Sequence, residues 1–203
     1  MILELLPEWN NSPAARNVRR KLDQKLNPDR AFNAASLNLD VADTVQNAMA
    51  LAEECMLKGR YREARELYQR SLRGIHADDP ELLMGLARAQ FGEQDYPATL
   101  ATLDLFKQHH PKKTSADGHL LYARALEGAG QLEAAIEEYE ALVRYYPGPE
   151  PACRLALICK ARGASQRATS LLEQVVKQSR IGGRHYQQLH GEWVALAQRE
   201  LQG

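Results

Sequence analysis

Cysteine, histidine and acidic residues at suitable spacing would indicate metal binding or acid–base catalysis. Cys153 and Cys159 are six residues apart, which does not fit zinc-ligand spacing, and no histidine pair lies near enough to complete four ligands. Cys55 and Cys159 occupy matching apolar columns of their predicted helices, so we interpret them as small buried hydrophobic residues. The sequence therefore predicts no metal and no cofactor.

The other candidate groups also lack catalytic partners. His109 and His110 precede a loop proline, and we expect them to cap or solvate that loop. The stretch EGAGQ (127–131) has a glycine pair without the lysine and Ser/Thr of a phosphate-binding loop. The stretch EEYE (137–140) places its carboxylates on an exposed helix face. Because no nucleophile, base and orienting group can be assigned together, we predict that the chain is not an enzyme.

The composition narrows the class of protein further. The 203 residues include 26 Lys+Arg and 26 Asp+Glu, and this zero net charge argues against coating nucleic acid or anionic lipid. Three cysteines form no paired framework, which favours a reducing compartment. No apolar run approaches the ~20 residues that span a bilayer, and MILELLPEW has too short an apolar run for a signal peptide. We expect a cytoplasmic protein.

Self-comparison of the sequence shows a repeat after residue 44. Small or turn-forming residues recur at separations of 35, 36 and 33 residues, at Gly59, Gln94, Gly130 and Gly163. A glycine at such a position permits positive φ after a helix end. The spacing therefore predicts four helix–turn–helix hairpins.

Further columns recur with each turn. Five residues after the turn, a small residue lets the two helices approach closely: Ala64, Thr99, Ala135 and Ala168. Two residues after the turn, the residue that would fill the gap at the helix crossing is Tyr61, Tyr96, Leu132 or Ser165. Eight residues before the turn stand Leu51, Leu86, Tyr122 and Leu155, each followed by alanine. One such hairpin cannot bury its own apolar face, so neighbouring hairpins must stack.

These columns resemble the tetratricopeptide repeat, a unit of ~34 residues, from about Val45 to Arg180. The resemblance implies an all-α, right-handed superhelical solenoid with terminal capping helices. The second repeat departs from the pattern at its turn, and Ser165 replaces the usual aromatic residue in the fourth. The predicted segments are 1–44 (N-terminal apolar segment and basic capping helices), the repeats 45–79, 80–115, 116–148 and 149–180, and the C-terminal capping helix 181–203.

In each first helix of a repeat, three residues at i, i+4 and i+7 point away from the stack, at ~100° per residue. In the family that this chain resembles, that face lines the concave groove. The resemblance therefore implies a stripe of apolar side chains beside Arg88 and Arg124, namely Met49, Met84, Leu120 and Cys153. The predicted partner-binding residues are Met49, Glu53, Met56, Met84, Arg88, Phe91, Leu120, Arg124 and Leu157.

This groove predicts a non-catalytic protein-interaction scaffold or adaptor. Methionine adapts to several partner shapes and arginine binds carboxylates with two parallel hydrogen bonds, so a peptide or helix with apolar and acidic residues would fit. Three alternatives stay open. The N-terminal helices would cover the stripe, or the chain would self-assemble through Trp9 and Trp193. In the third alternative, the chain would bind nucleic acid through a basic strip made of Arg88, Arg124, Arg154 and Lys160.

The two ends of the chain complete the prediction. In the tail, five residues fall near one helix face that would seal the last repeat: Tyr186, Leu189, Trp193, Leu196 and Leu201. Near the start, Ser12-Pro13 begins a basic helix, and a second helix is predicted over 29–39. The segments LPEW (6–9) and LNPDR (26–30) resemble the opening of bacterial repeat proteins that carry a membrane hairpin upstream. That resemblance implies a position at the inner face of the membrane.

Overall fold

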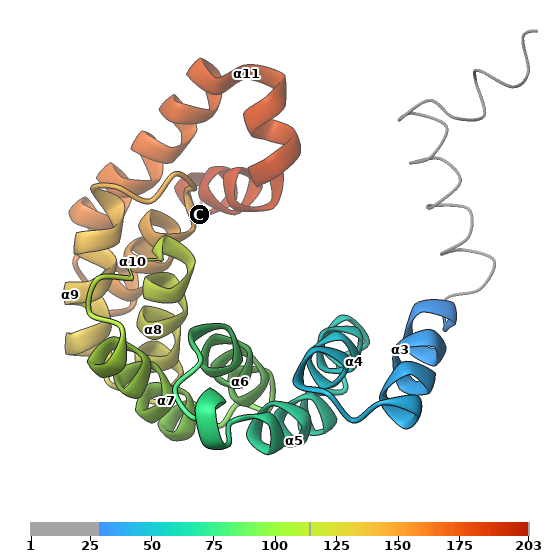
Figure 1. Cartoon of the computed structure of the whole chain (residues 1–203). Coiled ribbons are helices and arrows are strands. Elements are labelled where there is room, and N and C mark those ends of the chain that lie inside the picture. The colour runs from blue at the N-terminus through green and yellow to red at the C-terminus, as the bar shows by residue number, and fades with distance from the viewer. Residues whose placement is uncertain (1–28, 114, 203) are drawn as a thin grey trace, which may run out of the picture. The chain divides into compact units, whose positions relative to one another are not determined.

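The computed structural model describes residues 29–113 and 115–202, and each regular element in these ranges is a helix (Figure 1). The chain divides into two compact units, residues 1–77 and residues 78–203. The predicted all-α class is confirmed. The elements are α3 (Arg30–Val41), α4 (Val45–Leu57), α5 (Tyr61–Ser71), the short 3-10 helix η1 (Gly74–His76), α6 (Pro80–Gly92), α7 (Tyr96–His109), α8 (Ala116–Gly128), α9 (Leu132–Val143), α10 (Glu150–Ala161) and α11 (Ser165–Gln202).

The described part of unit 1 contains the α4–α5 hairpin, with α3 packed on α4, and the short helix η1. Its buried side chains are mostly small, with Ala52 and Cys55 of α4 and Ala64 of α5 almost inaccessible to solvent. Small side chains let the helices approach closely. Thr44 caps α4 because its hydroxyl accepts a hydrogen bond from the Asn47 amide at 3.2 Å.

Helix α3 is held against α4 by polar contacts at both of its ends. The Asn47 side-chain amide donates to the carbonyls of Ala42 at 2.8 Å and Asn38 at 3.0 Å. The Lys58 ammonium donates to the Asp29 carboxylate at 2.6 Å. The helix predicted over 29–39 is thus present as Arg30–Val41, whereas the basic helix and the LPEW segment lie outside the described residues.

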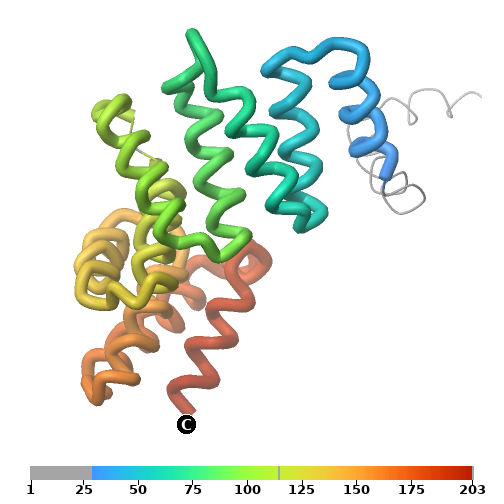
Figure 2. The backbone as a smooth tube through the Cα atoms, turned by 90° about the horizontal axis from the view of Figure 1, so that it is seen from below, coloured from blue at the N-terminus to red at the C-terminus, as the bar shows by residue number. Residues whose placement is uncertain are grey.

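Unit 2 contains three successive hairpins, α6–α7, α8–α9 and α10 with the first part of α11 (Figure 2). Each hairpin packs on the next one, through α7 with α8 and through α9 with α10. A continuous hydrophobic cluster runs through the unit from Leu100 to Ala197, and Tyr139, Leu142 and Leu155 are among its fully buried members. The stacking that the repeat pattern predicts is therefore present in this unit.

The backbone φ is positive at each of the four predicted turn positions: 70° at Gly59, 63° at Gln94, 74° at Gly130 and 79° at Gly163. At the third turn the amide of Gly130 donates to the Glu127 carbonyl at 3.0 Å, and the next amide donates to the Leu126 carbonyl at 2.9 Å. The same pair of bonds closes the other three turns. This is the Schellman arrangement, in which a left-handed residue satisfies the last carbonyls of a helix.

The small-residue column and Tyr96 also behave as predicted. The small residues five positions after the turns are at most 2% exposed, and Thr99 satisfies its hydroxyl by donating to the Asp95 carbonyl at 2.8 Å. Tyr96 packs against the next hairpin so closely that a Cβ at Gly128 would lie 2.5 Å from its ring. A glycine at position 128 therefore makes room for the tyrosine that fills the helix crossing.

Helix α11 is broken at Gly183, where φ is 61° and ψ is −152°. The chain reverses there, and the C-terminal segment, residues 184–202, returns along α10 (Figure 1). Val194 and Ala197 are its buried residues, whereas Leu189, which we predicted on the sealing face, is 64% exposed. The segment is rotated so that Trp193, Val194 and Ala197 meet α10. None of the described helices is long and apolar enough to cross a membrane.

Candidate partner-binding face

The predicted trio of α6 places an exposed arginine between two apolar side chains. Met84 and Phe91 are half-buried, and Arg88 between them is exposed. Arg88 forms no ion pair with any residue in the described ranges, so its guanidinium is available to a partner. Apolar side chains around an available arginine fit a site for an acidic, partly apolar partner.

The trio of α8 differs from the prediction. Leu120 is only 5% exposed because it belongs to the same hydrophobic cluster as Cys153 and Val194. Arg124 is half-buried and already has internal contacts: its guanidinium lies 4.8 Å from the centre of the Phe91 ring, and its Nε lies 3.5 Å from the Glu150 carboxylate. Leu120 is therefore a core residue beneath the face. Arg124 lies on the face, where its contacts with Phe91 and Glu150 fix its orientation.

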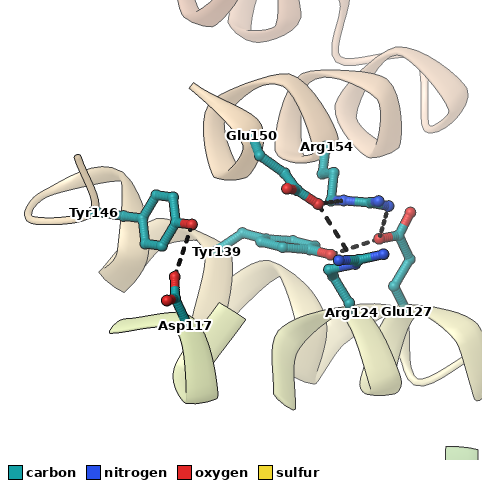
Figure 3. A network of polar contacts seen from close by, with 7 residues as sticks. All are labelled: Asp117, Arg124, Glu127, Tyr139, Tyr146, Glu150 and Arg154. Carbon is teal, nitrogen blue, oxygen red and sulfur yellow. Dashed lines mark hydrogen bonds and ion pairs between the residues drawn. The ribbon is translucent and has the colours of Figure 1, made fainter. Parts of the chain in front are cut away.

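A polar network lies beside Arg124 and connects α8, α9 and α10 (Figure 3). The Arg154 guanidinium donates to Glu150 at 2.7 Å and to Glu127 at 3.1 Å. The Tyr139 hydroxyl donates to Glu127 at 2.6 Å. Burial and this bond raise the pKa of Tyr139 far above its usual value. The phenol therefore stays neutral and keeps donating, and the network fixes both carboxylates.

The trio of α10 is partly covered by the C-terminal segment. Cys153 is fully buried, and its Sγ lies 3.6 Å from the Trp193 carbonyl. Lys160 pairs with Glu200 at 3.1 Å, and Leu157 remains 36% exposed. The prediction that Cys153 continues an open apolar stripe is therefore wrong. One alternative from the sequence was that the N-terminal helices cover the stripe. At α10 the C-terminal segment covers it instead.

We call Met84, Arg88, Phe91 and Arg124 the open part of the face, and Cys153, Leu157 and Lys160 the filled part.

Trp193 of the C-terminal segment packs against Arg154. The Arg154 guanidinium is 5.3 Å from the centre of the Trp193 ring. This packing leaves the ring half-buried within the unit. The self-assembly alternative through Trp193 thus receives no support from its position.

The predicted residues of unit 1 lie on α4. Met49 and Met56 are half-buried and Glu53 is exposed. Helix α3 and its N-cap residue Asp29 bond to Asn47 of α4 and to Lys58, which directly follows α4. At ~100° per residue, these two lie on the side of α4 opposite the predicted trio. The contacts of α3 therefore leave Met49, Glu53 and Met56 on another side of the helix.

The basic-strip alternative is weakened by internal pairing. Arg154 binds Glu127 and Glu150, Lys160 binds Glu200, and Arg124 lies beside Glu150. In the part of the chain that the structure describes, Arg88 is therefore the one member of the predicted strip without an acidic partner. A phosphate backbone would have to compete with these carboxylates.

The three cysteines are free and buried, as predicted for Cys55 and Cys159. Burial raises the pKa of the Cys153 thiol to about 12 and also raises the pKa of Cys55. His110 contacts the Asp78 carbonyl at 2.5 Å, which fits the predicted role in its loop. Among the described residues, no group of three His, Cys, Asp or Glu side chains is arranged to hold a metal ion.

Sequence reasoning missed the carboxylates that organise this face. Glu150 and Glu127 each bind an arginine from a neighbouring turn or helix, and Trp193 covers Arg154. The i,i+4 spacing of Glu150 and Arg154 was the available signal. The contacts between different hairpins have no such local signal.

Comparison with known proteins agrees with this fold. Residues 117–149 match the tetratricopeptide repeat family. No curated protein sequence matches the chain.

Solved structures of several proteins are similar to it. MamA from Desulfovibrio magneticus RS-1 is 16% identical (TM-score 0.66), with 81% of this chain and 92% of that chain covered. The TPR-like repeats of a Podosopora anserina kinesin light chain are 21% identical (TM-score 0.62; 80% and 92% covered). YrrB, described as a TPR protein with an unusual peptide-binding site, is 16% identical (TM-score 0.59; 77% and 81% covered).

The fold and the match define the class of protein: the chain has the tetratricopeptide repeat fold, and its third hairpin is a repeat of that family. The resemblance seen in the sequence is thereby confirmed. At these identities the solved structures establish the architecture.

Proposed function

We propose that the chain is a non-catalytic scaffold that binds an apolar, acidic segment of a partner protein on the open part of the first-helix face. The observation that carries this proposal is the exposed Arg88 between half-buried Met84 and Phe91, without an acidic partner among the described residues. A carboxylate on the partner would bind Arg88, while an adjacent apolar side chain would pack on Phe91.

Arg124 adds a second cation in a fixed orientation. Its guanidinium is held over Phe91 and beside Glu150. A side chain that is already ordered loses less entropy when a partner binds. The open part thus combines an adaptable arginine with a preorganised one.

The filled part supports a helix as the form of the partner segment. There the chain places its own C-terminal helix on α10, with Val194 and Ala197 buried and Glu200 bound to Lys160. Cys153 and Lys160 occupy the same places in α10 as Met84 and Phe91 in α6. An amphipathic helix with apolar residues and a carboxylate is therefore compatible with this kind of surface.

Known proteins with this fold give further support. YrrB is described as having a peptide-binding site, and its solved structure shares the architecture of this chain. The tetratricopeptide repeat at 117–149 contains Leu120, Arg124 and Glu127 of the α8 trio.

The test compares two charge reversals of exposed arginines. Purified parent, Arg88→Glu and Arg184→Glu chains, checked for folding by circular dichroism, would be used to recover partners from lysate of the source organism. We expect partners recovered by the parent to be lost, by about tenfold or more, with Arg88→Glu and retained with Arg184→Glu. Equal recovery by all three chains would contradict the proposal for this face.

A further inference from the structure

Unit 2 has a second concave feature on another side of α8. It is a half-open cleft of about 680 Å³ between α7, the loop that follows it, α8 and α9. At ~100° per residue, its lining residues His119 and Tyr122 lie on a different side of α8 from Arg124. Met84 borders both surfaces, but Arg88 and Phe91 do not line the cleft.

The inner wall of the cleft is apolar. Met84, Leu103 and Phe106 line it together with the Tyr122 ring. Gly118 lies at its base, where a Cβ would come within 2.9 Å of the Met84 methyl group. A cleft of this volume is within the range of ligand pockets, about 300–1,000 Å³. It therefore has room for apolar side chains of a bound segment.

One of the two acidic side chains of the cleft, Glu138, already has a partner. His119 Nε2 lies 2.5 Å from the Glu138 carboxylate, and the other ring nitrogen of His119 contacts the Tyr145 hydroxyl. Burial, together with the charges of Asp104 and Glu138, raises the pKa of the Tyr122 phenol. The Glu138 carboxylate is thus engaged by His119.

The lysines at the rim are unmatched. Lys107 and Lys113 line the cleft, are exposed, and form no ion pair with any residue described in the structure. An anionic group of a ligand could therefore bind these two lysines without displacing an internal partner. The complementary occupant is anionic at the rim and apolar inside.

We propose that this cleft binds a short acidic peptide segment of a partner, with a large apolar side chain inside and its carboxylates on Lys107 and Lys113. This site is additional to the open part of the first-helix face. A peptide carries the apolar side chain and the carboxylates on one backbone. The carboxylates stay hydrated at the rim, so only the apolar side chain is desolvated on binding.

The test uses a defined probe, a fluorescein-labelled peptide of sequence Gly-Glu-Glu-Trp-Glu-Glu-Gly, with fluorescence anisotropy as the readout. A control probe replaces every glutamate by glutamine. We expect the acidic probe to bind the parent and the glutamine probe to bind at least about tenfold more weakly. Binding should also weaken as salt is raised. No binding of the acidic probe to the parent, or equal binding of the two probes, would overturn the proposal.

Variants locate the site on the protein. Lys107→Glu/Lys113→Glu should weaken binding by about tenfold or more, whereas the matched double reversal Lys177→Glu/Arg184→Glu on α11 should change it less than about twofold. Ala116→Trp, which fills the cleft without a charge change, should also abolish binding. Loss of binding with Arg88→Glu but not with the two cleft variants would place the probe on the open part of the first-helix face and would overturn the proposal for the cleft. Unaltered affinity in both cleft variants, or equally tight binding of N-acetyltryptophan, would show that no peptide site lies here.

Discussion

Met84, Arg88 and Phe91 of the open part occupy the same positions in α6 as Cys153, Leu157 and Lys160 of the filled part in α10, yet the C-terminal segment packs only on the second set. In α6, Met84, Arg88 and Phe91 remain accessible, whereas in α10 the C-terminal segment buries Cys153 and pairs with Lys160. The difference arises from the break at Gly183, which returns the chain along α10. The same repeat position is thus a core residue where the C-terminal segment packs on it and a surface residue where no such segment does.

The largest expected effect comes from forcing the filled part to open. Val194 is 2% exposed, so Val194→Asp would bury a carboxylate without a partner. We expect a loss of about 3 kcal/mol in unfolding free energy. Since the C-terminal segment covers Cys153, that thiol should also react faster with a thiol reagent. Urea unfolding and timed thiol labelling measure the two effects.

A matched change on the same segment provides the control. Leu189 is 64% exposed, and Leu189→Asp should leave stability within about 0.5 kcal/mol of the parent. Equal behaviour of the Val194 and Leu189 variants would mean that the segment does not cover α10 in solution.

A smaller effect is expected at the boundary between the two parts, where Tyr139 donates to Glu127. Tyr139→Phe should cost about 1–2 kcal/mol at pH 7, because the half-buried Glu127 carboxylate loses a hydrogen-bond donor. The raised pKa of Tyr139 stabilises the folded chain at and below pH 10, and this stabilisation decreases as the pH rises further. The parent should therefore lose about 1.4 kcal/mol per pH unit above pH 10 from this residue, and the variant should not.

Urea unfolding from pH 8 to pH 11 measures this difference. Tyr61→Phe serves as the control, because that hydroxyl bonds to no residue in the described ranges. If Tyr139→Phe and the parent show the same pH dependence, the phenol is not buried in the way the network requires.

The smallest effect concerns the turns that join the helices of each hairpin. The α6–α7 hairpin has glutamine, Gln94, at its left-handed turn, whereas the α8–α9 hairpin has Gly130. Gln94→Gly should raise unfolding free energy by about 0.5–1 kcal/mol, since relief of backbone strain exceeds the added entropy of the unfolded chain. Gly130→Gln should lower it by a similar amount. Thermal unfolding of both variants tests this prediction, and shifts of the same sign would contradict it.

The sequence predicted the local features well because their causes are local. Gly59, Gln94, Gly130 and Gly163 were identified as turns by spacing alone, and each has positive φ. Positive φ at Gln94 shows that the position in the repeat decides the turn conformation, even where the residue type disfavours it.

The candidate face was predicted less well because it depends on distant segments. Leu120 and Cys153 have the helical phase of a surface position, but the C-terminal segment joins them in one hydrophobic cluster. The docking of that segment depends on a reversal at Gly183 and on residues some forty positions after Cys153. The pairing of Arg124 and Arg154 with acidic residues likewise joins different helices.

The succession of hairpins in unit 2 has a consequence for how this part of the chain folds. Its strongest contacts join helices that follow one another in the sequence, from α6–α7 through to α10–α11. Ordering any one hairpin therefore closes only a short loop, which favours rapid formation of structure. Loss of structure would begin at an end of the unit and advance hairpin by hairpin, so a terminal hairpin would exchange its amide hydrogens sooner than a central one.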